Sequence, residues 1–249
     1  MIQVSHLTKR YGDLTAVDDF SFDVQPGEIV GLLGPNGAGK TSTLRCLVGI
    51  QRPTRGTVTI GGHDIVSSPV EAKRHLAFMA DEPHLFEYLT VSEHLQLTAR
   101  IYGVRDLEPK AAALLDELEL TAKKDSLPGE LSRGMKQKVA IACGLLHDPR
   151  ALLFDEPLTG LDPLGIRRMR ETIVMRGRNG GAVIVSSHML HLVQEICTRV
   201  VIIDRGKKVA DGTIAELAAA RSTGTSSNLE QIFLQVTGQD EATPAAGES

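Results

Sequence analysis

The segment from Gly34 to Thr41 constrains the fold of this chain more than any other feature. It reads GPNGAGKT and fits the pattern G-x-x-x-x-G-K-[ST], which binds the phosphates of nucleoside triphosphates. The mostly apolar segment 28–33 before it predicts a buried strand, and residues 41–50 after it predict a helix. Because the pattern needs a strand, a glycine-rich turn and a helix start in this order, we interpret the segment as a phosphate-binding loop.

Each residue type in this loop has a chemical role. Glycine lets backbone N–H groups turn toward phosphate oxygens, because no Cβ blocks the approach. Lys40 would place a positive charge near the outer phosphates, which makes it a candidate catalytic residue, and the Thr41 hydroxyl would hold Mg²⁺. An incidental glycine-rich turn is the alternative for such a short motif. The residues predicted to contact the nucleotide are Gly34, Pro35, Asn36, Gly37, Ala38, Gly39, Lys40, Thr41 and Ser42.

Length and composition limit the classes of protein to consider. The 249 residues suffice for one large α/β domain, and 42% hydrophobic with 23% charged residues is typical of an ordered protein. The formal net charge of −4 predicts no nucleic-acid partner. We find no apolar run long enough to span a membrane and no signal peptide, so we expect a cytoplasmic protein. Cys46, Cys143 and Cys197 have no metal-type spacing and are expected to be free thiols.

The hydrophobic pattern changes twice along the chain. Strands are predicted first, then helices from about residue 90, then strands and helices in alternation. The alternation predicts a mostly parallel sheet covered by helices. The expected strands are residues 2–7, 17–24, 28–33, 57–60, 76–80, 151–154, 182–186, 199–204 and 207–210, and the expected helices are 41–50, 69–75, 90–103, 110–120, 132–147, 163–176, 189–196 and 228–236.

These elements predict the fold class and the domain organisation. We expect an α/β fold: a P-loop NTPase core with a mostly parallel sheet, an N-terminal antiparallel β subdomain and an inserted α-helical subdomain. Residues 1–220 would form the nucleotide-binding domain, with the helical subdomain at about 85–148. Residues 221–249 would form a short helix and a polar tail.

Two carboxylates, Asp155 and Glu156, follow the apolar strand 151–154. The carboxyl ends of parallel strands meet at one edge of the sheet, so both carboxylates should lie near the phosphate-binding loop. Asp155 would hold Mg²⁺, directly or through water. Glu156 would orient or deprotonate the water that attacks the γ-phosphate. A solvated acidic pair at the end of a strand is the alternative.

Further motifs stand in a fixed order around these carboxylates. The segment 131–135, LSRGM, lies upstream of the Asp155 strand, Gly-Leu-Asp follows the Glu156 turn at 160–162, and Ser-His ends the next core strand at 187–188. With these motifs, residues 1–213 resemble the ATP-binding subunits of ABC transporters, whose signature is Leu-Ser-Gly-Gly-Gln. The resemblance implies that the nucleotide is ATP.

The resemblance also implies that the ATP site needs a second subunit. Ser132 is a predicted N-cap, so the helix behind it presents N–H groups and the positive end of a dipole. In the family this helix end meets the γ-phosphate held by the partner, which assigns Ser132 and Gly134 to nucleotide binding. ATP would thus lie between two helix N-termini, one from each chain.

Three other residues receive roles in the same way. His188 would hydrogen-bond the γ-phosphate and hold Glu156 and water in line, although a histidine at a strand end is often only solvated. Tyr11 would stack on adenine, the alternative being an ordinary surface tyrosine. Asp162 would bridge the two subunits, a role compatible with capping the helix that starts at Pro163.

The chain departs from the family pattern in three places. Arg133 stands where glycine is usual and Met135 where glutamine is usual. The glutamine that touches Mg²⁺ and water is replaced by Asp81, a predicted metal ligand, with Glu82 as its alternative. The signature variant resembles the export-type subfamily of drug, sodium and polysaccharide exporters, as does the segment 229–234.

The implied function is an ATPase, converting ATP and water to ADP and phosphate, that energises a membrane exporter through ATP-driven dimer closure. Its partners would be an integral membrane permease and a second ATP-binding subunit, identical or related, with the chain peripheral on the inner face of the cell membrane. The alternatives are a soluble regulatory or mechanical ABC ATPase, an importer ATPase and a binding module without turnover. The sequence does not encode the transported substance.

Overall fold

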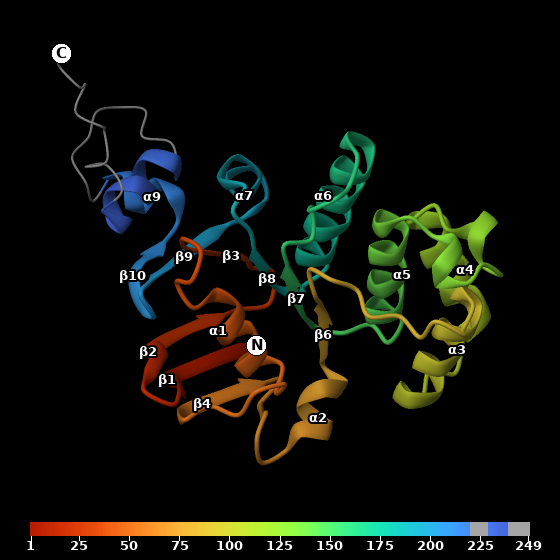
Figure 1. Ribbon diagram of the computed structural model, residues 1–249, viewed down its shortest axis with the longest axis horizontal. Coiled ribbons are helices and arrows are strands. Elements are labelled where there is room, and N and C mark those ends of the chain that lie inside the picture. The colour runs from red at the N-terminus through yellow and green to blue at the C-terminus, as the bar shows by residue number, and fades with distance from the viewer. Residues whose placement is uncertain (220–228, 239–249) are drawn as a thin grey trace.

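In the part of the chain that the structure describes, residues 1–219 and 229–238 of a computed structural model, the strands form two sheets (Figure 1). The smaller sheet is antiparallel, with the order β2-β1-β4-β5. Its strands are β1 (Ile2–Tyr11), β2 (Leu14–Val24), β4 (Arg55–Ile60) and β5 (His63–Asp64). This is the antiparallel N-terminal part that the sequence predicted.

The larger sheet has the order β10-β9-β3-β8-β7-β6, and only its edge strand β10 runs antiparallel to its neighbour. The predicted α/β fold with a mostly parallel sheet is therefore confirmed. The strands of this sheet are β3 (Ile29–Leu33), β6 (Leu76–Met79), β7 (Ala151–Asp155), β8 (Ala182–Ser186), β9 (Arg199–Asp204) and β10 (Lys207–Gly212).

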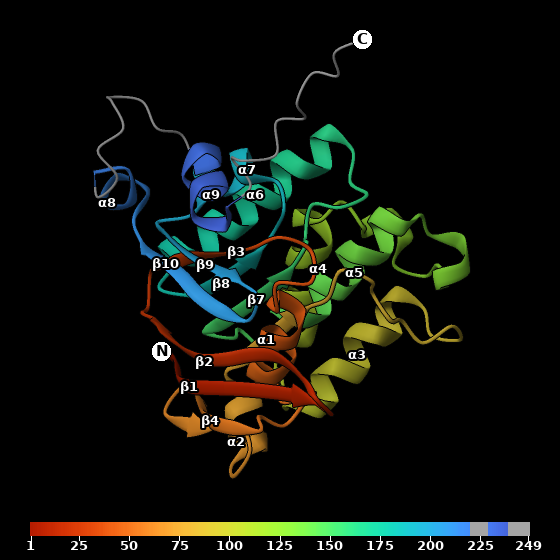
Figure 2. The ribbon, with the colours of Figure 1, turned by 60° about the vertical axis from the view of Figure 1, so that its left-hand side comes forward.

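The larger sheet is buried on both faces, which explains its continuous apolar strands. In β8, Ala182 and Ile184 pack toward the smaller sheet, whereas Val183 and Val185 pack toward the opposite layer of helices. The first helix lies between the two sheets (Figure 2). The helices are α1 (Lys40–Leu47), α2 (Pro69–Arg74), α3 (Val91–Tyr102), α4 (Leu107–Glu117), α5 (Arg133–Leu145), α6 (Pro163–Arg178), α7 (Leu190–Ile196), α8 (Ile214–Ala219) and α9 (Leu229–Thr237), with 3₁₀ turns at Thr121–Lys123 and Pro128–Glu130.

Helices α3, α4 and α5 lie together on the side of the molecule away from the smaller sheet (Figure 1). The predicted capping box at the start of α3 is present, because Thr90 accepts from the Glu93 N–H at 3.2 Å and Glu93 accepts from the Thr90 N–H. Gly103, with φ of 70°, ends the helix as expected. Within the described residues, no helix combines the length and the apolar character that crossing a membrane requires.

Several predicted boundaries were wrong, for identifiable reasons. Strand β1 continues past residue 7 because bulges, including His6 at φ of 51°, break the alternation that marked its predicted end. Helix α4 begins at Leu107 rather than 110, since Pro109 lies in the first turn, where a missing N–H costs nothing. It ends before Glu119, which has φ of 57°. Helix α8 was not predicted.

The C-terminal predictions are only partly covered. The helix expected at 228–236 is α9, whose Leu229 and Ile232 are buried against Leu33, Val200 and Ile202. Residue 228, the rest of 220–228 and the tail at 239–249 lie outside the described residues. The proposed division at residue 220 therefore remains a prediction.

The three cysteines are free thiols, as expected. Burial raises the pKa of Cys46 and of Cys143 to about 11 and that of Cys197 to about 12. They stay protonated at neutral pH and behave as small apolar side chains.

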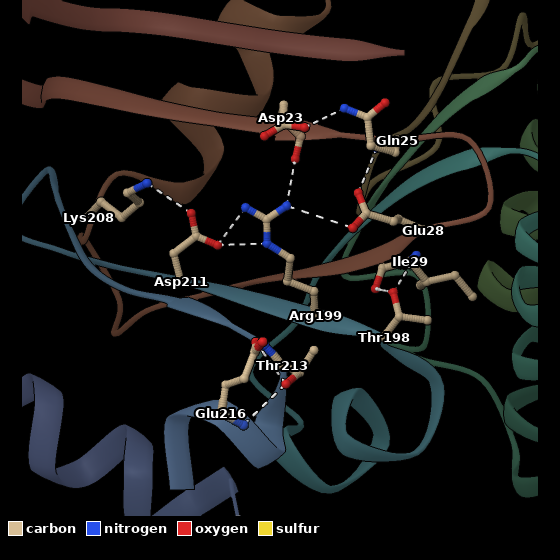
Figure 3. Close-up of polar contacts among 10 residues, drawn as sticks. All are labelled: Asp23, Gln25, Glu28, Ile29, Thr198, Arg199, Lys208, Asp211, Thr213 and Glu216. Carbon is tan, nitrogen blue, oxygen red and sulfur yellow. Dashed lines mark hydrogen bonds and ion pairs between the residues drawn. The ribbon is translucent and has the colours of Figure 1, made fainter. Parts of the chain in front are cut away.

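One arginine ties the two sheets together (Figure 3). Arg199 in β9 donates through Nε to Asp211 in β10 at 2.8 Å and through Nη1 to the Asp23 carbonyl oxygen of β2 at 3.2 Å. Glu28 lies 3.8 Å from the same guanidinium, and Lys208 donates to Asp211 at 2.9 Å. The network therefore holds the edge strand β2 of the smaller sheet against the larger sheet.

Candidate active site

A cleft of about 390 Å³ opens where the phosphate-binding loop leaves β3. It joins residues that lie far apart in the sequence: the β1–β2 hairpin, the loop with the start of α1, and the ends of β7 and β8. Its lining residues are Tyr11, Leu14, Ala16, Asn36, Gly37, Ala38, Gly39, Lys40, Thr41, Ser42, Asp155, Glu156 and Ser186. The predicted meeting of the loop with both carboxylates at one sheet edge is thus present.

The loop passes so close to its neighbours that glycine is required at two positions. A Cβ on Gly34 would lie 2.2 Å from the carbonyl oxygen of Ile203, and a Cβ on Gly39 would lie 2.4 Å from that of Ala16. Gly39 also has φ of 113° and forms the N-cap of α1 without a described side chain capping it. The first N–H groups of α1 therefore face the cleft, where an anion would find donors and a positive dipole end.

Lys40 is held inside the loop. It is 9% exposed, and its Nζ donates to the carbonyl oxygens of Gly34 at 2.6 Å and Pro35 at 3.1 Å. Burial lowers the pKa of Lys40, while the negative charges of Glu156 and Asp155 oppose this shift. Because the two hydrogen-bond partners of Nζ are neutral carbonyl oxygens, the ammonium remains available to a phosphate.

Asp155 closes the opposite wall of the cleft at the end of β7 and is 8% exposed. Burial raises the pKa of Asp155; the charges of Glu156 and Asp81 add to this shift, and the Ser186 hydroxyl and Lys40 oppose it. Ionising this buried carboxyl group costs folding free energy. A carboxylate in such a position is typical of a site that binds a cation.

Glu156 leaves the strand in an unusual direction. Its φ of 49° is left-handed, and its N–H donates to the Ser186 carbonyl oxygen at 2.9 Å. Its carboxylate accepts from His188 twice, from ring Nδ1 at 2.9 Å and from the backbone N–H at 3.4 Å. The predicted pair of Glu156 and His188 is therefore in direct contact, with the glutamate side chain 18% exposed and the histidine 63%.

The donor set fits a magnesium ion bound together with a nucleotide. The Thr41 hydroxyl and the Asp155 carboxylate line the same cleft, and both are oxygen ligands of the kind that Mg²⁺ prefers. Among the described residues, no group of three or more His, Cys, Asp or Glu side chains is arranged to hold a metal alone. The ion would therefore depend on phosphate oxygens for its remaining ligands.

Tyr11 lines the cleft, and the residue is 39% exposed. Its hydroxyl donates to Gln51 Oε1 and lies 3.4 Å from the Ser42 hydroxyl. Lys9 Nζ lies 4.9 Å from the ring centroid. The ring is therefore fixed relative to the start of α1, as a stacking platform requires.

The remaining predicted residues lie outside the cleft. Ser132 caps α5 by accepting from the Met135 N–H at 3.2 Å, and Asp162 caps α6 by accepting from the Gly165 N–H at 2.7 Å. A Cβ on Gly134 would lie 3.3 Å from Leu161. The predicted caps are confirmed, and none of these three residues lines the cleft that contains Lys40.

Asp81 takes a partner that the sequence did not suggest. Its Oδ1 accepts from Arg133 Nη2 at 3.3 Å, so two departures from the family pattern contact each other. The predictions also missed Ser186, although the strand-edge argument that found Asp155 applies to the end of β8. Gln51 carries no local sequence signal, because its contact with Tyr11 comes only from the folded chain.

A phosphate-binding loop beside a Mg²⁺-type carboxylate and a glutamate held by histidine defines a nucleoside triphosphatase. The comparisons with known proteins narrow this class. The family profile of the ABC transporter matches residues 17–159. The ABC-type transporter ATP-binding protein EcsA of Bacillus subtilis (strain 168) is 33% identical over 242 residues, covering 96% of this chain and 98% of EcsA.

Two further similarities agree. The SkfA peptide export ATP-binding protein SkfE of the same organism is 38% identical over 213 residues, covering 85% of this chain and 88% of SkfE. A solved ATP binding subunit of an ABC transporter is 33% identical with a TM-score of 0.91, covering 95% of this chain and 99% of that one. The chain belongs to the ABC transporter family of ATP-binding proteins. It is an ATP-hydrolysing subunit that energises a transporter, which confirms the predicted family and activity.

Proposed function

We propose that this chain binds Mg²⁺-ATP in the cleft and hydrolyses it with Glu156 as the residue that activates water. The carrying observation is the contact of Glu156 with His188 at 2.9 Å beside the phosphate-binding loop. Lys40 and the N–H groups at the start of α1 would bind the β- and γ-phosphates, and Thr41 and Asp155 would hold Mg²⁺. Tyr11 would stack on the adenine.

In this mechanism each residue acts on a defined atom. His188 fixes one carboxylate oxygen of Glu156, which leaves the other free to accept a proton from the attacking water. Lys40 and the helix dipole stabilise the charge that develops on the phosphate oxygens. Thr41 and Asp155 would hold Mg²⁺, whose positive charge would add to that of Lys40 in stabilising the phosphate oxygens.

A second ATP-binding subunit completes the site in this proposal. Ser132, Gly134 and Asp162 lie at helix starts outside the cleft of their own chain. A partner subunit docked over the cleft would bring the α5 N-terminus to the γ-phosphate, so that ATP closes the dimer and hydrolysis reopens it. The partner is either a second copy of this chain or a related subunit.

We further propose that the transporter is an exporter with an integral membrane permease. The support is the name of one relative, a peptide export protein, and the signature variant Arg-Gly-Met-Lys-Gln at 133–137. The chain would then act on the inner face of the cell membrane. Residues 85–148, which contain α3, α4 and α5, would move as an inserted subdomain when the dimer closes.

The first prediction tests the role of Glu156. Glu156→Gln should lower ATP turnover by at least about a hundredfold, because an amide cannot accept the proton of water. ATP binding should persist, and ATP should convert the variant to a stable dimer. Turnover by phosphate release and mass by light scattering measure both effects.

Glu171→Gln is the matched control, because Glu171 is an exposed carboxylate that pairs with Arg167 on α6. It should match the unsubstituted protein in turnover and mass. Unchanged turnover in Glu156→Gln would remove Glu156 from the mechanism. Failure of ATP to dimerise the variant would remove the second subunit from the site.

A further inference from the structure

Two side chains on one face of α5 hold the segment that follows β6. Gln137 is 3% exposed, and its Nε2 donates to the carbonyl oxygen of Ala80 at 3.2 Å. One helical turn nearer the N-terminus, Arg133 Nη2 donates to Asp81 Oδ1 at 3.3 Å. Residues i and i+4 lie on the same side of a helix, so α5 holds two consecutive residues of this segment.

The two anchors differ in strength. The Gln137 side chain is buried, so its amide has no ready alternative in solvent and loss of the contact with Ala80 would cost a hydrogen bond. The Arg133 and Asp81 side chains are 53% and 44% exposed, and an ion pair of this kind contributes little and can exchange. The first contact is therefore a fixed attachment, and the second is open to competition.

Packing keeps the Arg133 side chain close to Asp81. A Cβ on Gly160 would lie 3.3 Å from Arg133 Cδ and 3.4 Å from its Nε, so the side chain rests against the loop after Glu156. The guanidinium thus has a defined position between this loop and Asp81, rather than extending freely into solvent.

Asp81 does not line the cleft itself, but it follows β6 at the same sheet edge as Asp155, because β6 and β7 are parallel neighbours with Met79 paired to Phe154. Burial makes the largest contribution to the raised pKa of Asp155, and the negative charges of Glu156 and Asp81 add to it. Asp81 is thus near enough to Asp155 to influence its charge. A divalent cation at Asp155 and the guanidinium of Arg133 would both be attracted to the Asp81 carboxylate.

We propose that Arg133 is a positioning residue that competes with the divalent cation for Asp81. Within one protomer, Arg133 pairs with Asp81 at the N-terminus of α5. When the cation binds, Asp81 turns to it, directly or through water, and Arg133 is released. Occupation of the metal site thereby alters the contact between the segment after β6 and α5. This inference rests on the proposed binding of Mg²⁺-ATP in the cleft.

The test measures binding without turnover, using Glu156→Gln as the background. A fluorescent ATP analogue is titrated with Mg²⁺, and the Mg²⁺ concentration for half-maximal binding is read. Adding Arg133→Ala should lower this concentration about threefold, as expected for loss of a half-exposed ionic competitor. Arg133→Lys keeps the charge but loses the forked geometry, and should give an intermediate value.

The decisive comparison adds Asp81→Asn. If Arg133 acts through Asp81, Arg133→Ala should produce no further shift in the Asp81→Asn background. Arg167→Ala is the matched control, since Arg167 pairs with Glu171 at 3.1 Å on exposed α6, and it should leave the Mg²⁺ midpoint unchanged.

Three results would overturn the inference. These are no shift with Arg133→Ala, the same shift with and without the Asp81 carboxylate, and an equal shift with Arg167→Ala. If the analogue does not bind at any Mg²⁺ concentration, the proposed function fails and this inference fails with it. Binding with an unchanged midpoint defeats the inference alone, so the two failures are distinguishable.

Discussion

Helices α1 and α5 both begin at positions that the sequence marks for phosphate, but the two N-termini are built differently. α1 begins at a glycine N-cap inside a cleft and carries a buried lysine in its first turn. α5 begins outside the cleft with its N-terminus capped by Ser132, and Arg133 is paired with Asp81. The N-terminus of α1 thus has its donors open to the cleft. At the N-terminus of α5, the donors already contact neighbouring side chains.

From this difference we expect α1 to serve ATP binding in one protomer and α5 to serve closure of the dimer. The donors of α1 need no partner to form, so a single protomer should bind the triphosphate. In the proposed dimer, the donors of α5 would reach nucleotide only after another subunit arrives, and they would then exchange their local contacts. Substitutions at α1 should therefore change nucleotide affinity in one protomer, whereas substitutions at α5 should change dimer formation.

The largest effect is expected at the α1 end. Lys40→Ala should weaken ATP binding by about tenfold to a hundredfold, because it removes a charged hydrogen-bond donor from the phosphates. Equilibrium titration of single protomers at low protein concentration measures it. Lys207→Ala, which removes a 70% exposed lysine paired with Asp18, is the control and should bind normally. Full affinity in Lys40→Ala would contradict a phosphate-binding role for the loop.

The next prediction separates close packing from backbone conformation in the same loop. Gly34→Ala should destabilise the fold by about 1–3 kcal/mol or more, because its Cβ would meet the Ile203 carbonyl oxygen. In Gly37→Ala the new Cβ would meet no atom within 4 Å. Only the left-handed backbone, with φ of 78°, should lower the free energy of unfolding, by about 1–2 kcal/mol. Denaturant unfolding of both variants ranks them. Equal losses would show that contact with Ile203 is not the constraint.

How far the sequence predicts the structure differs between the same two regions. The α1 end follows from a contiguous motif, since the strand, loop and helix are consecutive, and the parallel-sheet rule adds Asp155 and Glu156. The strand β1 was predicted only as far as residue 7, because bulges interrupt the alternation in its continuation to Tyr11. Gln51, which holds Tyr11, comes from a loop whose position depends on the folded smaller sheet.

At the N-terminus of α5, the Ser132 cap was predicted, but the contact of Arg133 with Asp81 was not. Ser132 is a recognisable N-cap, whereas the pairing of Arg133 with Asp81 joins residues 52 positions apart. No local pattern encodes such a pair. It depends on how α5 lies against the end of β6, which tertiary packing decides.

A smaller effect is expected at the α5 cap. Ser132→Ala should lower stability by about 1 kcal/mol, because the Met135 N–H loses its acceptor. ATP affinity of the single protomer should stay unchanged, while ATP-driven dimerisation in the Glu156→Gln background should weaken. Unfolding and light scattering measure the two effects. Ser132→Asp, which can also cap, should restore stability but not dimerisation, since it adds a negative charge facing the γ-phosphate.

The same Ser132→Asp variant distinguishes the two roles of that residue. If dimerisation recovers together with stability, Ser132 acts only as a helix cap. The α5 N-terminus then has no separate role in binding the nucleotide of another subunit. If stability recovers alone, the α5 N-terminus meets an anion supplied by another subunit.

The smallest effect concerns the pH dependence of stability, which should originate in the cleft. The folded-state pKa of Asp155 is raised, mainly by burial, so ionisation of this carboxyl costs stability as the pH rises through that pKa. Asp155→Asn should therefore be more stable than the unsubstituted protein at pH 7. The difference should vanish as the pH falls below the ordinary aspartate pKa of 3.8, where both side chains are neutral. Ser186 and Lys40 offset part of the cost, which keeps the effect small.

Denaturant unfolding at a series of pH values measures this difference. Asp148→Asn is a suitable control, because Asp148 is an exposed partner of Lys110 outside the cleft. It should give no gain at pH 7. Since Asp155→Asn should also lose Mg²⁺-dependent ATP binding, a variant that gains stability while losing the cation would show that the α1 side of the site sacrifices stability for its ligand. An Asp155→Asn variant less stable at pH 7 would instead mean that the carboxylate is satisfied within the folded chain before any cation arrives.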